Sequence, residues 1–235
     1  MGAWLKRLSI LAVLGFPITV IGSRLGFYDF RIGFSILTYT VYLAAAVFLV
    51  GLIVIFVQRK SNQAGSAAAR TAVLLALIPL AIIGNTLVNI RSVPAIHNIS
   101  TDTINPPQFQ KIIELRGEGT NPLEYDASSL AEVQLKAYPE VQTLMTSDTP
   151  EQAHAKALSV VAELGWELVN DDVSKGIIEA TETTALWAFK DDVVIRITQQ
   201  GEQTAIDLRS VSRVGQSDIG ANAKRIKKFL SNYSS

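Results

Sequence analysis

The sequence predicts an α+β protein in which three transmembrane helices precede a soluble domain with a four-stranded antiparallel sheet flanked by helices. Only 18% of the residues are charged, against about 25% in an average soluble domain. Residues 1–92 hold the long uncharged stretches and carry eight basic side chains against one acidic, whereas residues 93–235 carry thirteen against twenty. Strand and helix patterns lie in the second part. We therefore expect a membrane domain at 1–92 and a soluble domain at 93–235.

Three uncharged segments predict the membrane helices. They contain 16, 27 and 20 residues and lie between Arg7 and Arg24, between Arg31 and Arg59, and between Arg70 and Arg91. About 20 apolar residues in a helix cross a bilayer, and the first segment reaches this length if Lys6 and Arg7 snorkel. We predict helices at about 4–23, 36–57 and 71–90.

The first segment has an alternative interpretation. A Lys-Arg start followed by a short apolar run is also typical of a secretory signal peptide. Val20-Ile21-Gly22 is a poor small-x-small cleavage site, however, so we favour an uncleaved helix. In the third helix, Asn85 and Asn89 are one turn apart and could hydrogen-bond another membrane helix. The second and third spans contain no ionisable residue, so we do not expect a conducting pore.

Basic residues beside the spans predict the orientation, because they favour the cytoplasmic side. If the N-terminus is in the cytoplasm, five of these basic residues lie on the cytoplasmic side and three lie outside. The cytoplasmic residues are Lys6, Arg7, Arg59, Lys60 and Arg70, and the outer ones are Arg24, Arg31 and Arg91. We therefore expect a multi-pass protein of the inner (cytoplasmic) membrane. Its C-terminal domain is expected to be periplasmic or extracellular.

The soluble part begins with an irregular, proline-rich stretch from Val93 to about Ser147. Thr149-Pro150-Glu151-Gln152 is a capping box that starts a helix, and Gly165 is a suitable stop for it. The apolar and turn patterns that follow predict strands at 166–170, 176–184, 192–199 and 204–213. A last helix is expected from about Ser217, its N-cap, to Leu230.

Strand alternation predicts a polar cluster on one face of the sheet. Side chains two residues apart share a face, so Arg196 would join Asp207, Arg209 and Arg213 if these strands pair. Such a cluster has two interpretations. It could be a structural lattice of ion pairs, or its guanidinium groups could bind an anion through paired hydrogen bonds.

The candidate site also includes the polar segment that leads from the last strand into the last helix, because free N–H groups at a helix start can bind an anion. The candidate ligand- or partner-binding residues are Asp102, Arg196, Asp207, Arg209, Ser212, Arg213, Asp218 and Asn222. Asn85 and Asn89 are the candidate contacts within the membrane.

Several strings in the soluble part resemble a known family. They are Ile99-Ser100-Thr101-Asp102-Thr103-Ile104-Asn105-Pro106-Pro107, Ala137-Tyr138-Pro139, Ile178-Glu179-Ala180-Thr181, Asp191-Asp192-Val193-Val194-Ile195-Arg196, and the run from Asp207 to Asn222. Over about residues 93–232 the sequence resembles domain-of-unknown-function family 1499 (DUF1499). The three spans, with the loop Leu25 to Arg31, look like those of its membrane-anchored members. The resemblance implies no catalytic residues.

Composition and motifs narrow the function classes. The chain has no cysteine, which excludes disulfides, thiolate metal sites and a cysteine nucleophile, and two histidines are too few for a histidine-rich metal site. We expect no cofactor and no nucleic-acid partner. The leading hypothesis is a non-enzymatic envelope protein that binds a protein partner or an anionic lipid or glycan group. The alternatives are an accessory subunit of a larger membrane complex, or a hydrolase or transferase using Asp102 or Asp218 with Ser210 or Ser212.

Overall fold

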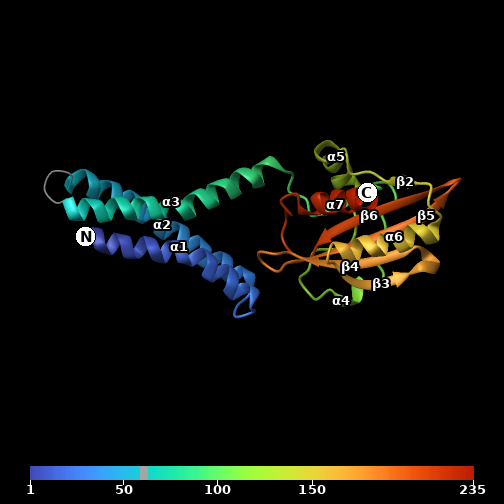
Figure 1. The fold of residues 1–235 in the computed structure, drawn as a ribbon, viewed down its shortest axis with the longest axis horizontal. Helices are drawn as coiled ribbons and strands as arrows, with labels where there is room; N and C mark the ends of the chain where they lie inside the picture. The colour runs from blue at the N-terminus through green and yellow to red at the C-terminus, as the bar shows by residue number, and fades with distance from the viewer. Residues whose placement is uncertain (59–62) are drawn as a thin grey trace. The chain divides into compact units, whose positions relative to one another are not determined.

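The computed structural model describes residues 1–58 and 63–235, which form two compact units, Met1–Asn89 and Ile90–Ser235 (Figure 1). Arg59 and Lys60, two of the basic residues used to predict the orientation, lie outside the described residues. Each unit has its own core, and the two are described separately.

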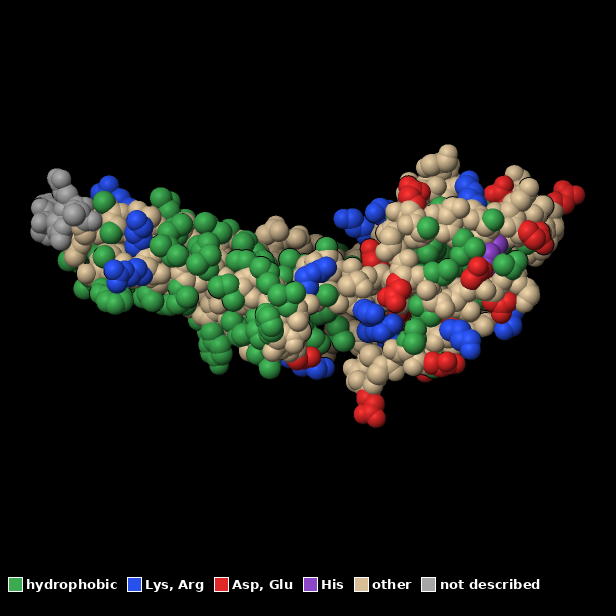
Figure 2. Space-filling view, turned by 60° about the horizontal axis from the view of Figure 1, so that its bottom comes forward, with side chains coloured by type: hydrophobic (Ala, Val, Ile, Leu, Met, Phe, Trp, Pro, Cys, Tyr) green, Lys and Arg blue, Asp and Glu red, His purple; other side chains and the backbone are tan. Residues whose placement is uncertain are grey.

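The N-terminal unit consists of α1 (Gly2–Arg24), α2 (Phe30–Gln58) and α3 (Gln63–Ser92). All three are long and apolar enough to cross a membrane, which confirms the prediction of three apolar helices before the soluble domain. Hydrophobic side chains cover much of the surface of these helices (Figure 2). Small residues let the helices approach closely: a Cβ added to Gly51 would stand 2.5 Å from Val73. Asn85 and Asn89 are exposed on α3, and their contact with another helix stays a prediction.

The C-terminal unit contains one antiparallel sheet with strand order β1-β6-β5-β4-β3, and β2 also pairs with β6. The strands are β1 (Asn98–Ser100), β2 (Leu144–Thr146), β3 (Glu167–Asp172), β4 (Ile177–Thr183), β5 (Lys190–Gln200) and β6 (Gln203–Ser212). The four predicted strands are confirmed as β3 to β6. The predicted number of four strands is wrong, because β1 and β2 also pair with β6. Each of these two strands has only three residues, which is too short to show an alternating pattern.

Two helices cover one face of the sheet, which we call the helix face: α6 (Pro150–Glu163) and α7 (Ala221–Tyr233). The capping box of Thr149 and Gln152 is confirmed at the start of α6. The main core lies between these helices and the inward side chains of β5 and β6. It includes a stacked pair, Trp166 and Phe229, whose ring centroids are 5.9 Å apart.

The α7 helix begins at Ala221, so the predicted start at Ser217 is wrong. Ile219 and Gly220 both have positive φ, which a right-handed helix cannot accommodate. The Asp218 carboxylate takes the capping role instead, since it accepts the backbone N–H groups of Gly220 (2.7 Å) and Asn222 (3.0 Å).

Irregular chain covers the opposite face of the sheet. We call residues 101–126 the covering segment; it contains α4 (Ile112–Leu115), and α5 (Ala127–Ala137) follows it. A second apolar core joins this segment to the sheet and consists of Phe109, Ile112, Ile177, Val194 and Val211. The domain therefore has three layers, and residues 101–126 form the third.

Candidate functional site

The structure places the predicted arginines on the face of the sheet beneath the covering segment. Arg196 of β5 lies opposite Asp207 of β6 in the strand register. Arg196 Nη2 donates to Asp207 Oδ2 at 2.8 Å and to Asp102 Oδ2 at 2.9 Å. Arg196 Nε is buried and has no acceptor among the described residues. The Arg196 guanidinium therefore faces two carboxylates. With one cation and two anions, this cluster carries one net negative charge.

A second cluster on this face surrounds Asp192 of β5, which was not among the candidate residues. Its carboxylate is fully buried and binds two guanidinium groups, Arg116 Nη1 at 2.6 Å and Arg213 Nη2 at 2.8 Å. The Thr181 hydroxyl also donates to it at 2.8 Å. The pKa of Arg116 is lowered, and burial is the largest cause. Two cations share one anion here, so this cluster carries one net positive charge.

Arg209 lies between the two clusters and is completely buried. Its guanidinium donates to Asn98 Oδ1 (3.0 Å) and to the backbone carbonyls of Pro107 (3.1 Å) and Leu123. Burial lowers the pKa of Arg209 to about 10, which leaves it charged at neutral pH. Arg209 has a structural task in the fold, because it is inaccessible to solvent and all three of its guanidinium nitrogens have acceptors within the domain.

Sequence analysis missed Glu179, a fully buried carboxylate in β4. It accepts the backbone N–H groups of Gln110 (2.7 Å) and Lys111 (2.8 Å) and the side-chain amide of Asn170 (3.0 Å). The sequence signal for a buried carboxylate was a glutamate inside the apolar string Ile177–Ala180. Glu179 holds the start of α4 against the sheet.

The remaining candidates lie on the helix face, so the sheet separates them from the arginines. Asn222 donates to Ser212 Oγ at 3.0 Å and accepts from Ser210 Oγ at 2.6 Å. Arg225, also missed by sequence analysis, binds Asp191 at 2.6 Å and reaches Ser210 and Asn222. The eight predicted residues therefore do not form one site.

Asp218 lies on this side of the sheet as well, at the start of α7. Burial raises its pKa, while the N–H groups of Asn222 and Gly220 act in the opposite direction. The hydroxyls of Ser210 and Ser212 are buried under α7 and bound to Asn222. Asp102 lies on the opposite face with Arg196, so it cannot activate either serine.

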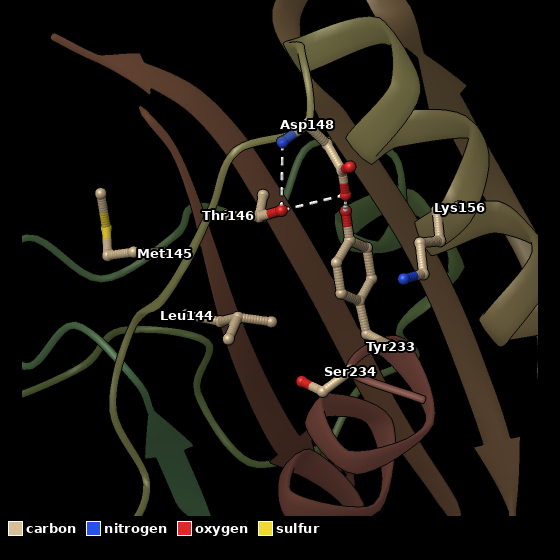
Figure 3. Close-up of a pocket in the computed structure, with 7 residues that line it drawn as sticks. All are labelled: Leu144, Met145, Thr146, Asp148, Lys156, Tyr233 and Ser234. Carbon is tan, nitrogen blue, oxygen red and sulfur yellow. Dashed lines mark hydrogen bonds between the residues drawn. The ribbon is translucent and has the colours of Figure 1, made fainter. Parts of the chain in front are cut away.

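An open pocket at the edge of the domain was not predicted (Figure 3). It has a volume of about 450 Å³, including open solvent, and is lined by Leu144, Met145, Thr146, Asp148, Lys156, Tyr233 and Ser234. Tyr233 donates its hydroxyl to Asp148 at 2.8 Å. Hydrogen bonds from Tyr233 and Thr146 lower the pKa of Asp148, and burial raises the pKa of Tyr233. The pair therefore stays as a carboxylate and a neutral phenol at neutral pH, which suits hydrogen bonding rather than proton transfer.

A family model described as "Protein of unknown function (DUF1499)" matches residues 98–232. The chain belongs to the DUF1499 family. The match begins with β1 and ends within α7, so the DUF1499 domain includes the covering segment, all six strands and both charged clusters. No curated protein matches the chain.

Replacing Asp192 tests the second cluster. Asp192→Asn leaves Arg116 and Arg213 buried side by side without a carboxylate, and we expect the free energy of unfolding to fall by about 3–5 kcal/mol. Arg213→Gln is the matched control, because Asp192 keeps Arg116 as its partner and the loss is smaller. Denaturant unfolding of the full chain in detergent measures both. An Asp192→Asn protein as stable as the wild type would contradict the charge assignment.

Proposed function

We propose that this protein is a non-enzymatic envelope protein anchored in the cytoplasmic (inner) membrane by three helices. Its N-terminus lies in the cytoplasm and its DUF1499 domain lies outside, in the periplasm or extracellular space. The spans α1 to α3 support the anchoring. The orientation rests on the basic residues beside these spans, because more of them would lie on the membrane side that holds the N-terminus, and basic residues favour the cytoplasm.

In this proposal the DUF1499 domain binds an anionic group, a carboxylate or phosphate of a lipid, a glycan or a protein partner, at Arg213. The observation that carries it is the charge of the Asp192 cluster, where two guanidinium groups share one carboxylate. The Arg213 side chain is 15% exposed, whereas Asp192 is fully buried, so the excess positive charge reaches solvent through Arg213. Arg196 is less suitable because it already faces two carboxylates.

The state of the serines supports binding rather than hydrolysis or group transfer. A serine nucleophile needs a base within hydrogen-bond reach and access for the substrate. Ser210 and Ser212 are buried, and their hydroxyls contact amide and guanidinium groups, which are not bases at neutral pH.

A second candidate function, accessory subunit of a membrane complex, is favoured by Asn85. This amide is exposed on a helix that is apolar enough to span the membrane. A polar side chain in that position is favourable when another helix supplies its hydrogen-bond partner. The two candidates are compatible, because one concerns α3 and the other concerns the DUF1499 domain.

The cysteine-free sequence allows a direct test of the orientation. We expect a membrane-impermeant maleimide to label Ser235→Cys in intact spheroplasts and to label Ala3→Cys only after permeabilisation. Both positions are exposed, so the membrane alone decides their reactivity. Labelling of Ala3→Cys but not Ser235→Cys in intact spheroplasts would reverse the proposed orientation.

Native mass spectrometry of the detergent-extracted protein tests the binding. The wild type is expected to retain an anionic lipid, glycan or peptide mass, and Arg213→Gln to retain about tenfold less, because a charge-assisted hydrogen bond is worth about 1.5–3 kcal/mol. Lys227→Gln removes the same charge from an exposed ion pair with Glu140 and serves as the control. Equal retention by all three proteins would contradict a role for Arg213.

A further inference from the structure

The chain enters the DUF1499 domain from α3 at one end of the sheet. Val93, the first residue after α3, lies 3.6 Å from the position of a Cβ on Gly220, just before α7. Asp218 donates its backbone N–H to Ile96 O, and Ser212 donates to His97 O, so the chain then runs beside the end of β6. The apolar helix Gly65–Ser92 has 28 residues. At about 1.5 Å per residue it spans about 42 Å, the thickness of a bilayer with its headgroups. The chain therefore passes from this apolar helix into the DUF1499 domain at this end of the sheet.

Two loops lie at this end. One joins β4 to β5 (residues 184–189) and the other joins β6 to α7 (residues 213–220). They are neighbours because Arg213 donates its backbone N–H to the carbonyl of Lys190, the first residue of β5. Figure 1 shows both loops at the same end of the sheet.

The β4–β5 loop is apolar throughout its tip, with the sequence Ala185-Leu186-Trp187-Ala188-Phe189. Thr184 closes its base, since its carbonyl accepts the N–H of Ala188 (3.1 Å) and its hydroxyl accepts the N–H of Phe189 (2.9 Å). The rings of Trp187 and Phe189 stack with centroids 6.2 Å apart. Leu186 is 49% exposed. Trp is enriched where a protein meets the headgroup layer, and Trp, Phe and Leu form the apolar face of segments that lie in that layer.

Backbone strain marks the same two loops. Among the residues that the structure describes, the non-glycine residues with positive φ are Ala188 (55°) and Ile219 (53°), one in each loop. Positive φ is especially unfavourable for a β-branched residue such as isoleucine, and such strain concentrates at functional sites. Ile219 is 44% exposed, so each loop presents one large aliphatic side chain, Leu186 or Ile219, at this end.

The charges around the loops suit an anionic lipid surface. Lys190 follows the β4–β5 loop directly, and its side chain is 45% exposed. Glu167 lies 3.6 Å from it, but an exposed pair of this kind contributes little and leaves the ammonium accessible. Glu182, the acid that precedes the loop, is paired with Arg225.

We propose that the β4–β5 loop, with Ile219 beside it, inserts its apolar side chains into the headgroup region of the same bilayer that α3 crosses. The loop then acts as a second membrane contact that fixes the orientation of the DUF1499 domain on the lipid surface. This interaction needs no ligand at Arg213 and therefore goes beyond the proposed function. It rests only on the membrane anchoring by α1 to α3.

A fluorescent probe on the loop tests this proposal. The full chain carries NBD at Leu186→Cys and is reconstituted into vesicles of phosphatidylethanolamine and phosphatidylglycerol. We expect emission at shorter wavelength than in water and strong quenching by headgroup-region doxyl lipids. The matched control carries the probe at Glu202→Cys, an exposed residue in the β5–β6 turn at the opposite end of these strands. We expect water-like emission without quenching there.

A second variant shows whether the apolar side chains cause the contact. Trp187→Asp in the Leu186→Cys protein is expected to return the emission to that of the Glu202→Cys control, while far-UV circular dichroism stays unchanged. Three results would overturn the proposal. The first is water-like, unquenched emission at position 186. The second is short-wavelength emission that lipid quenchers do not reduce, which would indicate a protein contact. The third is equal quenching at positions 186 and 202.

Discussion

The structure of the DUF1499 domain depends on how the backbone of the covering segment finds its hydrogen bonds. Where an irregular, proline-rich segment packs against a sheet, the N–H and C=O groups that it buries lose water and must be paired within the protein. Here charged side chains of the sheet pair with many of them. Arg209 binds the carbonyls of Pro107 and Leu123, Arg213 binds that of Leu115, and Glu179 binds the N–H groups at the start of α4.

This arrangement determines which charges are available for function. A buried charge that loses its partner is strongly destabilising, so Arg209, Asp192 and Glu179 are committed to the fold. The Asp192 cluster keeps an excess positive charge, and Arg213 carries it to the surface. The anion binding that we propose at Arg213 and the stability of the third layer therefore both involve the Asp192 carboxylate. The apolar loop 184–189 is closed by its own hydrogen bonds, since Thr184 accepts the N–H groups of Ala188 and Phe189.

Local patterns in the sequence predicted the elements that carry their own signal. The capping box at Thr149, the three spans and the four longer strands are examples. Alternation also placed Arg196 on the same face as Asp207. The roles of Arg116, Glu179 and Arg225 were not predictable, because each depends on a partner 34 or more residues away in sequence: Asp192, the backbone of Gln110 and Asp191, respectively. The covering segment has no periodic pattern, so the long-range pairing that makes it a layer is visible only in three dimensions.

Hydrogen exchange of the full chain in detergent, followed by mass spectrometry, tests the central claim most directly. If charged side chains of the sheet hold the covering segment, the amides of Gln110 and Lys111, which bind the Glu179 carboxylate, exchange nearly as slowly as those of β5 and β6. Peptides that contain these two amides would then remain protected for as long as the sheet does. Exchange of these peptides within seconds, while the sheet stays protected, would contradict the account.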